Sequence, residues 1–213
     1  MRMNVTTIIP AYNEGKNIGQ VLTTICSVDM IDKIIVVSDG SIDDTVEVAK
    51  TFGVDIVELD KNYGKGFAMK TGLNYTKSPI ILFLDADLKG IQPYHINALL
   101  EPICLDMVDM TLGIFNEGRG VTDLAQRVTP FLTGQRGVKK SILDEIQEKN
   151  GWSEGFGVEL MLTKHAIENQ LRILEVPLQH VSHAMKEEKM GLTKGVASRL
   201  KMYWEIAKEL NKY

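Results

Sequence analysis

The first 90 residues alternate between short apolar runs and segments with helical spacing, and this alternation constrains the fold more than any other feature. Residues 33–40, KIIVVSDG, show the strand type: a continuous run of β-branched residues that stops at polar ones. Ile18, Val21 and Ile25 instead recur at the intervals of one helix face. The pattern predicts an α/β fold with a mainly parallel central sheet and helices on both of its faces. The expected strands are 4–9, ending at Pro10, then 33–40, 54–60 and 79–87, and the expected helices are 13–28, 41–53 and 64–76.

The second half of the chain has a less regular pattern, and its 213 residues in total fit one domain. Pro130 and the glycines of TGQRG, 133–137, interrupt a region with helical pieces and predict a loop there. The other expected elements are helices over 94–107 and 155–170, strands over 108–115 and within 171–184, and a final helix that ends at the C-terminus.

Polar side chains follow each of the four early strands. In parallel sheets ligands bind outside the carboxyl ends of the strands, where loops and helix N-termini converge. Glycines and Lys65 in YGKG stand before an expected helix, which is a natural position for a phosphate, although a plain glycine turn explains them as well. The segments at these ends are PAYNE (10–14), SDGSIDD (38–44), DKNYGKG (60–66) and DADLKG (85–90).

Two aspartates, Asp85 and Asp87, close the apolar run ILFL and are separated by one alanine. Residues two apart in a strand point the same way, so both carboxylates are expected to face one site. Two neighbouring carboxylates repel each other unless a cation or a proton intervenes, and Mg²⁺ or Mn²⁺ prefers such oxygen ligands. A turn with solvated acids is the alternative for this motif taken alone.

Four motifs in order, IIPAYNEGKNI, VVSDGSIDDT, NYGKGFAMKTG and ILFLDADL, closely resemble the nucleotide-sugar domain of the family 2 glycosyltransferases, which have the Rossmann-like GT-A fold. The resemblance implies one GT-A domain over 1–213, with a nucleotide-sugar half in 1–90 and an acceptor-side half in 91–213. It also implies metal-dependent transfer of a sugar from a UDP- or GDP-linked donor to an acceptor, with Mn²⁺ or Mg²⁺ as cofactor. Many relatives have a second acid where this chain has Ser38.

The resemblance also assigns roles to individual residues. Asp87 is expected to coordinate the cation, together with His183 rather than His180. Asp87 and Glu159 are the expected catalytic residues, with Glu154 as another candidate general base; a phosphate acceptor needs no base. The residues expected to contact the nucleotide sugar are Pro10, Ala11, Tyr12, Asn13, Glu14, Asp39, Gly64, Lys65, Asp85 and Ala86.

A basic, glycine-containing stretch around Arg136 has a composition that suits an anionic acceptor, such as a polyprenyl phosphate. Thr133, Gly134 and Arg136 are the expected acceptor contacts, and a solvated basic loop is the alternative. The final helix carries Tyr203 and Trp204 on one stripe, which fits either a bilayer surface or packing on the sheet. Lysines beyond His183 are expected either to hold the diphosphate or to lie in solvent.

Charge and composition narrow the class of partner. A formal net charge of −4 gives no basic field for nucleic acid. No apolar stretch reaches the roughly 18 residues of a membrane span, and the N-terminal run is too short for a signal peptide. Cys26 and Cys104 are expected to be buried thiols in a reducing compartment. These features predict a cytoplasmic protein, with peripheral attachment to the inner face of the membrane and homo-oligomerisation left open.

Two other functions fit parts of the pattern. A sugar-phosphate nucleotidyltransferase also binds nucleotides on such a sheet, but usually has a glycine-rich loop after the first strand, where PAYNEGKN supplies one glycine. A non-catalytic nucleotide-sugar-binding protein would retain the fold without the chemistry.

Overall fold

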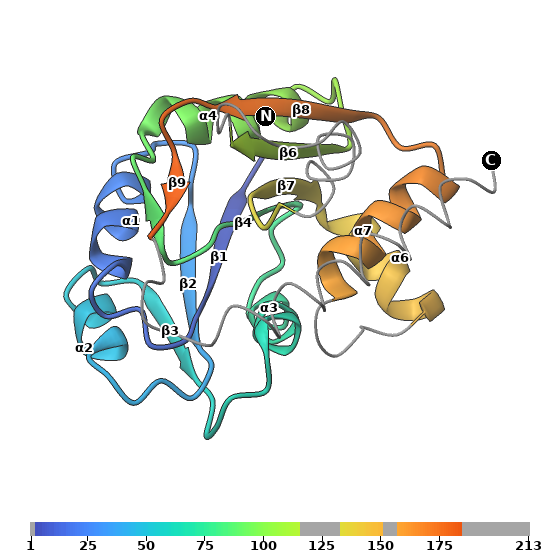
Figure 1. Cartoon of the computed structure of the whole chain (residues 1–213). Helices are drawn as coiled ribbons and strands as arrows, with labels where there is room; N and C mark the ends of the chain where they lie inside the picture. Colours follow the sequence, from blue (N-terminus) through green and yellow to red (C-terminus); the bar gives the residue numbers. More distant parts are fainter. Residues whose placement is uncertain (1–2, 116–132, 151–156, 185–213) are drawn as a thin grey trace, which may run out of the picture.

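The computed structural model describes residues 3–115, 133–150 and 157–184, which form a seven-stranded sheet with helices on both faces (Figure 1). The strand order is β3-β2-β1-β4-β7-β6-β8, and a separate ladder pairs β5 with β9. The strands are β1 (Val5–Ala11), β2 (Lys33–Ser38), β3 (Asp55–Glu58), β4 (Ile80–Phe83), β5 (Leu88–Lys89), β6 (Met110–Phe115), β7 (Arg136–Lys139), β8 (Ile173–Leu178) and β9 (Ser182–His183). The helices are α1 (Ile18–Ile25), α2 (Thr45–Lys50), α3 (Lys65–Leu73), α4 (Pro93–Cys104), α6 (Lys140–Asn150) and α7 (Gly157–Glu168).

Most strand pairs are parallel, as the alternation of strands and helices predicts. β3, β2, β1 and β4 run parallel to one another, and β6 runs parallel to β8. β7 lies antiparallel to both β4 and β6 and joins the two parallel groups. The carboxyl ends of β1, β2 and β4 therefore meet at one edge of the sheet, where polar loops follow them.

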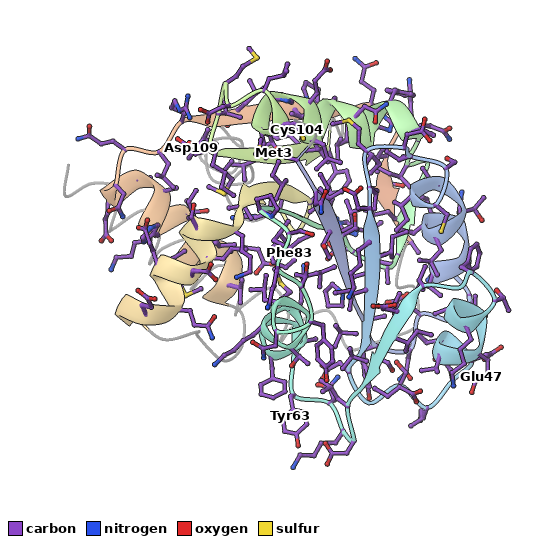
Figure 2. The ribbon with its side chains drawn as sticks, turned by 180° about the vertical axis from the view of Figure 1, so that it is seen from behind. Met3, Glu47, Tyr63, Phe83, Cys104 and Asp109 are labelled. Atoms are coloured by element: carbon purple, nitrogen blue, oxygen red, sulfur yellow. The ribbon has the colours of Figure 1, made fainter. Side chains whose placement is uncertain are left out.

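Two apolar layers hold the helices against the sheet. Successive residues of a strand point to opposite faces, so Ile9 packs in the layer with α1 and α4, and Ile8 packs in the layer with α3, α6 and α7. Phe83, labelled in Figure 2, is 1% exposed and belongs to the second layer. Each such side chain contributes about 1.5–3 kcal/mol on burial. Cover on both faces explains why these strands are continuously apolar.

The first strand passes through Pro10 instead of ending there. Pro10 pairs in register with Val37 of β2, but the ladder between β1 and β4 ends at Ile8, which is opposite Phe83. The carbonyl of Ile8 accepts a hydrogen bond from the N–H of Leu84, so the backbone groups of Ile8 face the β4 side. Pro10 is two residues further along the strand, so its backbone groups face the same side. The missing N–H of Pro10 therefore costs no ladder hydrogen bond.

The fourth strand is shorter than predicted. β4 ends at Phe83, and Asp85 and Asp87 lie beyond it, with a turn at Ala86 and Asp87. The expectation that strand alternation points both carboxylates the same way is therefore wrong. A turn brings them to one site instead.

The predicted loop over TGQRG is wrong at its C-terminal end: Thr133–Gln135 lie outside regular structure, but Arg136 and Gly137 belong to a strand. Arg136–Lys139 forms β7 inside the sheet, and Gln135 and Arg136 are 0% exposed. The ammonium groups of Lys139 and Lys140 pair with Asp109 and Asp144, respectively, at 2.7 and 2.6 Å. The alternative of a solvated basic loop is likewise wrong, because these cations are engaged in the fold.

The cysteine prediction is also wrong for one residue: both thiols are free, but Cys26 is exposed and Cys104 is partly exposed. Glu154, the lysines after His183 and the expected C-terminal helix lie outside the described residues. Within the described ranges, no helix has the length and apolar character needed to cross a membrane.

An ionic cluster joins residues at the ends of three strands. Asp109 precedes β6, Lys139 ends β7 and Arg172 precedes β8, and Asp109 accepts hydrogen bonds from both cations. The backbone N–H of Arg172 also donates to Asp109 at 3.0 Å. The guanidinium of Arg172, and then Lys139, hold the pKa of Asp109 below its ordinary value although partial burial opposes them.

We expect Asp109→Asn to lower the free energy of unfolding by about 1–2 kcal/mol at pH 7, because it removes charge-assisted hydrogen bonds to two cations. A depressed pKa stabilises the fold above the unfolded pKa of about 3.9 and loses that effect as pH falls. Urea denaturation should therefore show the difference at pH 7 and a smaller one near pH 3.

Asp144→Asn is the matched control, since its ion pair with Lys140 joins residues i and i+4 on a half-exposed helix face. It should cost no more than about 0.5 kcal/mol. Equal effects of the two substitutions would contradict a role for the Asp109 cluster in joining the strands.

Candidate active site

A pocket of about 760 Å³ lies at the carboxyl ends of β1 and β2, beside the start of α3. It brings together most residues that the sequence places at a nucleotide-sugar site. Asn62 and Ala184, which the sequence did not single out, also line it. Asn13 is not a lining residue; its side-chain oxygen accepts from the N–H of Ile42. The predicted residues that line the pocket are Pro10, Ala11, Tyr12, Glu14, Asp39, Gly64, Lys65, Asp85, Ala86, Asp87 and His183.

The loops after β1 and β2 are fixed to each other by hydrogen bonds. The N–H of Glu14 donates to the hydroxyl of Thr45 at 2.8 Å, and that of Gly15 donates to Asp43 at 3.0 Å. Asp43 also accepts from the N–H and the hydroxyl of Thr45. This use of Asp43 accounts for the start of α2 at Thr45, later than the predicted Ser41 or Asp43.

Asp39 finds its hydrogen-bond donors in the backbone of the next loop. Its two oxygens accept from the N–H groups of Tyr63 at 2.7 Å and Gly64 at 2.8 Å, and the residue is 3% exposed. These bonds compensate the burial of the carboxylate. They also place the N-terminus of α3 beside the pocket.

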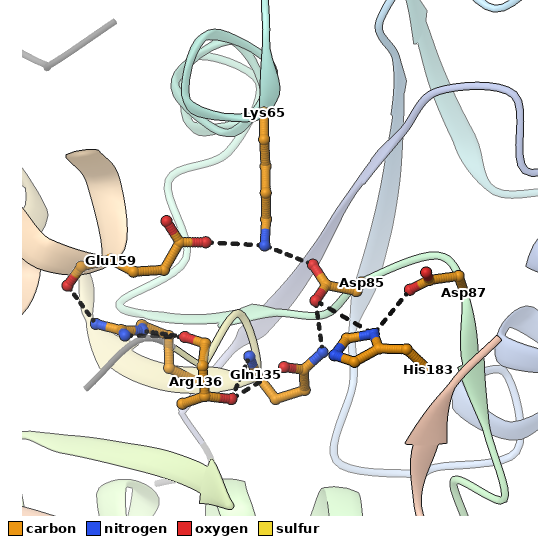
Figure 3. Close-up of polar contacts among 8 residues, drawn as sticks. Lys65, Asp85, Asp87, Gln135, Arg136, Glu159 and His183 are labelled. Carbon is orange, nitrogen blue, oxygen red and sulfur yellow. Dashed lines mark hydrogen bonds and ion pairs between the residues drawn. The ribbon is translucent and has the colours of Figure 1, made fainter. Parts of the chain in front are cut away.

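Asp85, Asp87 and His183 converge on one wall of the pocket (Figure 3). His183 Nδ1 lies 3.0 Å from Asp87 Oδ1 and 4.0 Å from Asp85 Oδ2. The hydrogen bond to Asp87 raises the pKa of His183 above its ordinary value. His180 lies in the turn between β8 and β9 and does not join this group.

The short ladder between β5 and β9 brings these residues together from distant parts of the sequence. Leu88 pairs with His183, and the N–H of Ala184 donates to the carbonyl of Asp87 at 2.8 Å. Gly90 has φ of +77°, and a Cβ there would meet the carbonyl oxygen of His180. The close approach of the two segments therefore depends on glycine at position 90.

Lys65 links the pocket to α7. Its ammonium lies 2.6 Å from Asp85 and 2.8 Å from Glu159 (Figure 3). Burial opposes a charge on Lys65, but the two carboxylates outweigh burial and raise its pKa above the ordinary value. The sequence prediction placed Lys65 near the base or phosphates and Glu159 toward the site; the structure places both side chains in one ion-pair group.

Arg136 lies behind this group and not on an open surface. Its guanidinium donates to the carbonyl of Thr133 at 2.9 Å and to that of Glu159 at 3.4 Å. Burial lowers the pKa of Arg136 to about 10, with Glu159 and Asp85 opposing the shift, so it stays charged at neutral pH. Thr133 is 8% exposed and Gly134 is buried, and neither they nor Arg136 line the pocket. The buried Arg136 side chain is therefore not placed to contact an acceptor at an exposed surface.

The structure also reveals a site residue that the sequence did not indicate. Gln135 Nε2 donates to Asp85 Oδ2 at 2.8 Å (Figure 3). Nothing in a lone glutamine beside a glycine signals such a contact, because it depends on the antiparallel pairing of β4 with β7.

The acidic pair and the imidazole fit a divalent cation. One ligand atom from each of Asp85, Asp87 and His183 lies within 4.8 Å of the other two. Carboxylate oxygens with one imidazole nitrogen suit Mn²⁺, and the two carboxylates alone also suit Mg²⁺. A cation here would relieve the repulsion between the two aspartates.

Comparisons with known proteins indicate the family and the fold of the chain. The family described as glycosyl transferase family 2 matches residues 6–167. An undecaprenyl-phosphate 4-deoxy-4-formamido-L-arabinose transferase from Edwardsiella ictaluri is 28% identical over 211 residues, which are 89% of this chain and 64% of the relative. A 4,4'-diaponeurosporenoate glycosyltransferase from Staphylococcus aureus is 34% identical over 102 residues, 46% of this chain and 27% of the relative. The chain thus spans less than two thirds of either relative.

A solved structure provides a spatial match over most of the chain. Glucosyl-3-phosphoglycerate synthase from Mycobacterium tuberculosis, in complex with Mn²⁺, uridine diphosphate and glucosyl-3-phosphoglycerate, superposes with a TM-score of 0.75. The two are 25% identical, and the match covers 92% of this chain and 76% of the other. The predicted GT-A fold is therefore confirmed.

We expect Gly90→Ala to weaken Mn²⁺ binding about tenfold or more, because its Cβ would push β9 away from β5 and move His183 off Asp87. Electron paramagnetic resonance of free Mn²⁺ in a protein titration measures this affinity. Gly53→Ala is the control, because Gly53 also has positive φ but no atom within 4 Å of its Cβ position. An unchanged affinity in Gly90→Ala would show that the ladder does not set the position of His183.

Proposed function

The chain belongs to glycosyl transferase family 2, and we propose that it transfers a sugar from a nucleotide-diphosphate sugar to a phosphate-bearing acceptor with the help of a divalent cation. The observation that carries this proposal is the pocket at the carboxyl ends of the strands, in which Asp85, Asp87 and His183 share one wall. Its volume of about 760 Å³ is in the range of small-molecule sites. We assign one GT-A domain to 1–213, in which 1–90 supplies most of the donor pocket and 91–213 contributes His183 and Glu159.

The donor would lie across the loops that follow β1 and β2. Pro10, Ala11, Tyr12 and Glu14 would contact the nucleoside from one side, and Asp39 and Gly64 from the other, since all six line the pocket. Tyr12 is 45% exposed, so its ring is accessible to a base. UDP is the favoured nucleotide, because the mycobacterial synthase was solved with uridine diphosphate; GDP remains the alternative.

Asp87, His183 and Asp85 would hold the cation, as Mn²⁺ or Mg²⁺. When bound, such a cation neutralises negative charge that develops on the departing diphosphate. Lys65 adds a fixed positive charge at the same wall, since its ammonium is held by Asp85 and Glu159. Preorganised charges of this kind favour the transition state over the ground state.

A phosphate-bearing acceptor agrees with the surroundings of Glu159. One oxygen of Glu159 is paired with the Lys65 ammonium at 2.8 Å, which leaves this carboxylate poorly suited to take a proton from a hydroxyl acceptor. A phosphate is already nucleophilic and needs no general base. The names of two similar proteins point the same way. The Edwardsiella transferase is named for undecaprenyl phosphate, and the mycobacterial synthase is named for glucosyl-3-phosphoglycerate.

A polyprenyl-phosphate acceptor would place the protein at the inner face of a membrane, on the cytoplasmic side, by peripheral contact. A phosphorylated small molecule would require no membrane. Transfer assays with each acceptor class separate these two cases, and vesicle co-sedimentation tests the attachment itself.

The two rival functions make different demands on the site. A sugar-phosphate nucleotidyltransferase would consume a nucleoside triphosphate, whereas family membership favours a diphosphate sugar as donor. A non-catalytic nucleotide-sugar-binding protein would bind the donor and release no nucleotide.

With UDP- and GDP-sugars, Mn²⁺ and either a polyprenyl phosphate or a phosphorylated three-carbon acid, we expect nucleotide release that depends on both metal and acceptor. Release should be at least about 100-fold above the background rate, a modest fraction of usual enzymatic accelerations. Coupled detection of UDP or GDP measures it. Donor binding without any release would instead support the non-catalytic alternative.

We expect Asp87→Ala to weaken the affinity for UDP in the presence of Mn²⁺ by about tenfold or more, because the substitution removes one charged metal ligand. Calorimetric titration with UDP in the presence and absence of Mn²⁺ measures the effect. Asp60→Ala, at an exposed carboxylate outside the pocket lining, is the control. Retained metal dependence in Asp87→Ala would remove Asp87 from the site.

A further inference from the structure

Both polar atoms of the buried Gln135 side chain form hydrogen bonds. Its Nε2 donates to Asp85 Oδ2 at 2.8 Å, and its Oε1 accepts from the hydroxyl of Thr133 at 3.0 Å. A carboxylate cannot donate, so the amide nitrogen must face Asp85. The residue is 0% exposed, which fixes its rotamer within the fold.

We propose that Gln135 is a positioning residue that orients the Asp85 carboxylate for the metal and the donor diphosphate. The inference rests on the proposed function, since it concerns the same pocket. Gln135 would not touch the substrate; it acts through Asp85. No motif in the sequence assigns this role to it.

Lys65 alone cannot fix the orientation of Asp85. It contacts Asp85 Oδ1 at 2.6 Å, but its ammonium is shared with Glu159 at 2.8 Å. A single contact on one oxygen leaves the carboxylate free to rotate about its bond to Cβ. The second contact, from Gln135 to Oδ2, removes that freedom.

The geometry identifies the competing orientation. Asp85 Oδ2 lies 4.0 Å from His183 Nδ1, while Asp87 Oδ1 lies 3.0 Å from the same nitrogen. Without the amide, Asp85 Oδ2 can close on His183 and compete with Asp87 for it. Gln135 therefore holds apart the two carboxylates that share one imidazole.

A neutral donor suits this position better than a charged one. Asp85 already lies beside the ammonium of Lys65, and Arg136 adds a second positive charge, which is buried behind the group. A cationic side chain in place of Gln135 would compete with the metal for Asp85. A carboxylate in its place would repel Asp85. An amide fixes the orientation and leaves the net charge unchanged.

The backbone next to Gln135 packs closely against Asp85 and Lys65. A Cβ at Gly134 would lie 2.6 Å from Asp85 Oδ2 and would also meet the Lys65 ammonium. The backbone at Gly134 thus packs directly against the Lys65–Asp85 pair. Gln135 reaches Asp85 from this fixed backbone, so the segment acts as a rigid support.

The test compares Gln135→Met with Gln135→Glu. Methionine keeps the length and removes the donor; glutamate keeps the shape and adds a negative charge. In Gln135→Met we expect affinity for UDP in the presence of Mn²⁺ to fall by about 10- to 100-fold, the effect of losing one hydrogen bond to a charged group. Gln135→Glu at pH 8 should lose at least as much. Calorimetric titration measures both.

Thr6→Val is the control for stability, because Thr6 is also fully buried in the sheet and its hydroxyl is hydrogen-bonded to that of Thr76 at 2.7 Å, near the start of β1 and away from the pocket. It should lower the unfolding free energy and leave nucleotide affinity unchanged. Affinity of Gln135→Met within twofold of the wild type, or an equal loss in Thr6→Val, would overturn the inference.

A crystal structure of Gln135→Met gives a result that requires no ligand. We expect Asp85 to rotate toward His183, and an unmoved Asp85 overturns the role of Gln135. Failure of the wild-type protein to bind any nucleotide sugar would instead contradict the proposed function. The two failures are thus distinguishable.

Discussion

The ion pairs of Lys65 with Asp85 and Glu159 are the interaction on which the rest of the candidate site depends. They join three segments that are far apart in the sequence: the start of α3, the chain after β4 and helix α7. The side chains of Asp85 and Glu159 are only 18% and 14% exposed, so the Lys65 ammonium is the charge that compensates both carboxylates. The same contacts that hold the fold together here also fix the electrostatics of the pocket wall.

Strand β7 makes this arrangement possible, because it enters the sheet against the direction of its neighbours. It places Gln135 and Arg136 next to the end of β4, where Asp85 follows. Arg136 then holds the carbonyls of Thr133 and Glu159, so its buried guanidinium compensates two backbone groups as well as the nearby carboxylates. The cost of burying it is offset by these partners and not by solvent.

The metal-binding wall is built on a different principle, the pairing of two very short strands. β5 and β9 contribute two residues each, yet they set the distance between Asp87 and His183. Such a ladder is too short to be stable alone. Its position depends on Leu88 and Val181, which are buried in the layer with α1 and α4. Apolar packing below the site thus determines the geometry of the polar groups above it.

The sequence by itself determined the α/β class, the parallel first half and the list of polar residues at the strand ends, because these follow from local periodicity and residue type. The resemblance to the family added the pairing of Asp87 with His183 as metal ligands and placed Asp85 at the nucleotide sugar. The sequence did not reveal that β4 ends at Phe83, that TGQRG leads into a central strand, or that Gln135 contacts Asp85. Those features arise from pairing between segments about 50 residues apart. Only the tertiary structure decided them, since hydrogen bonds between distant strands leave no periodic trace in either one.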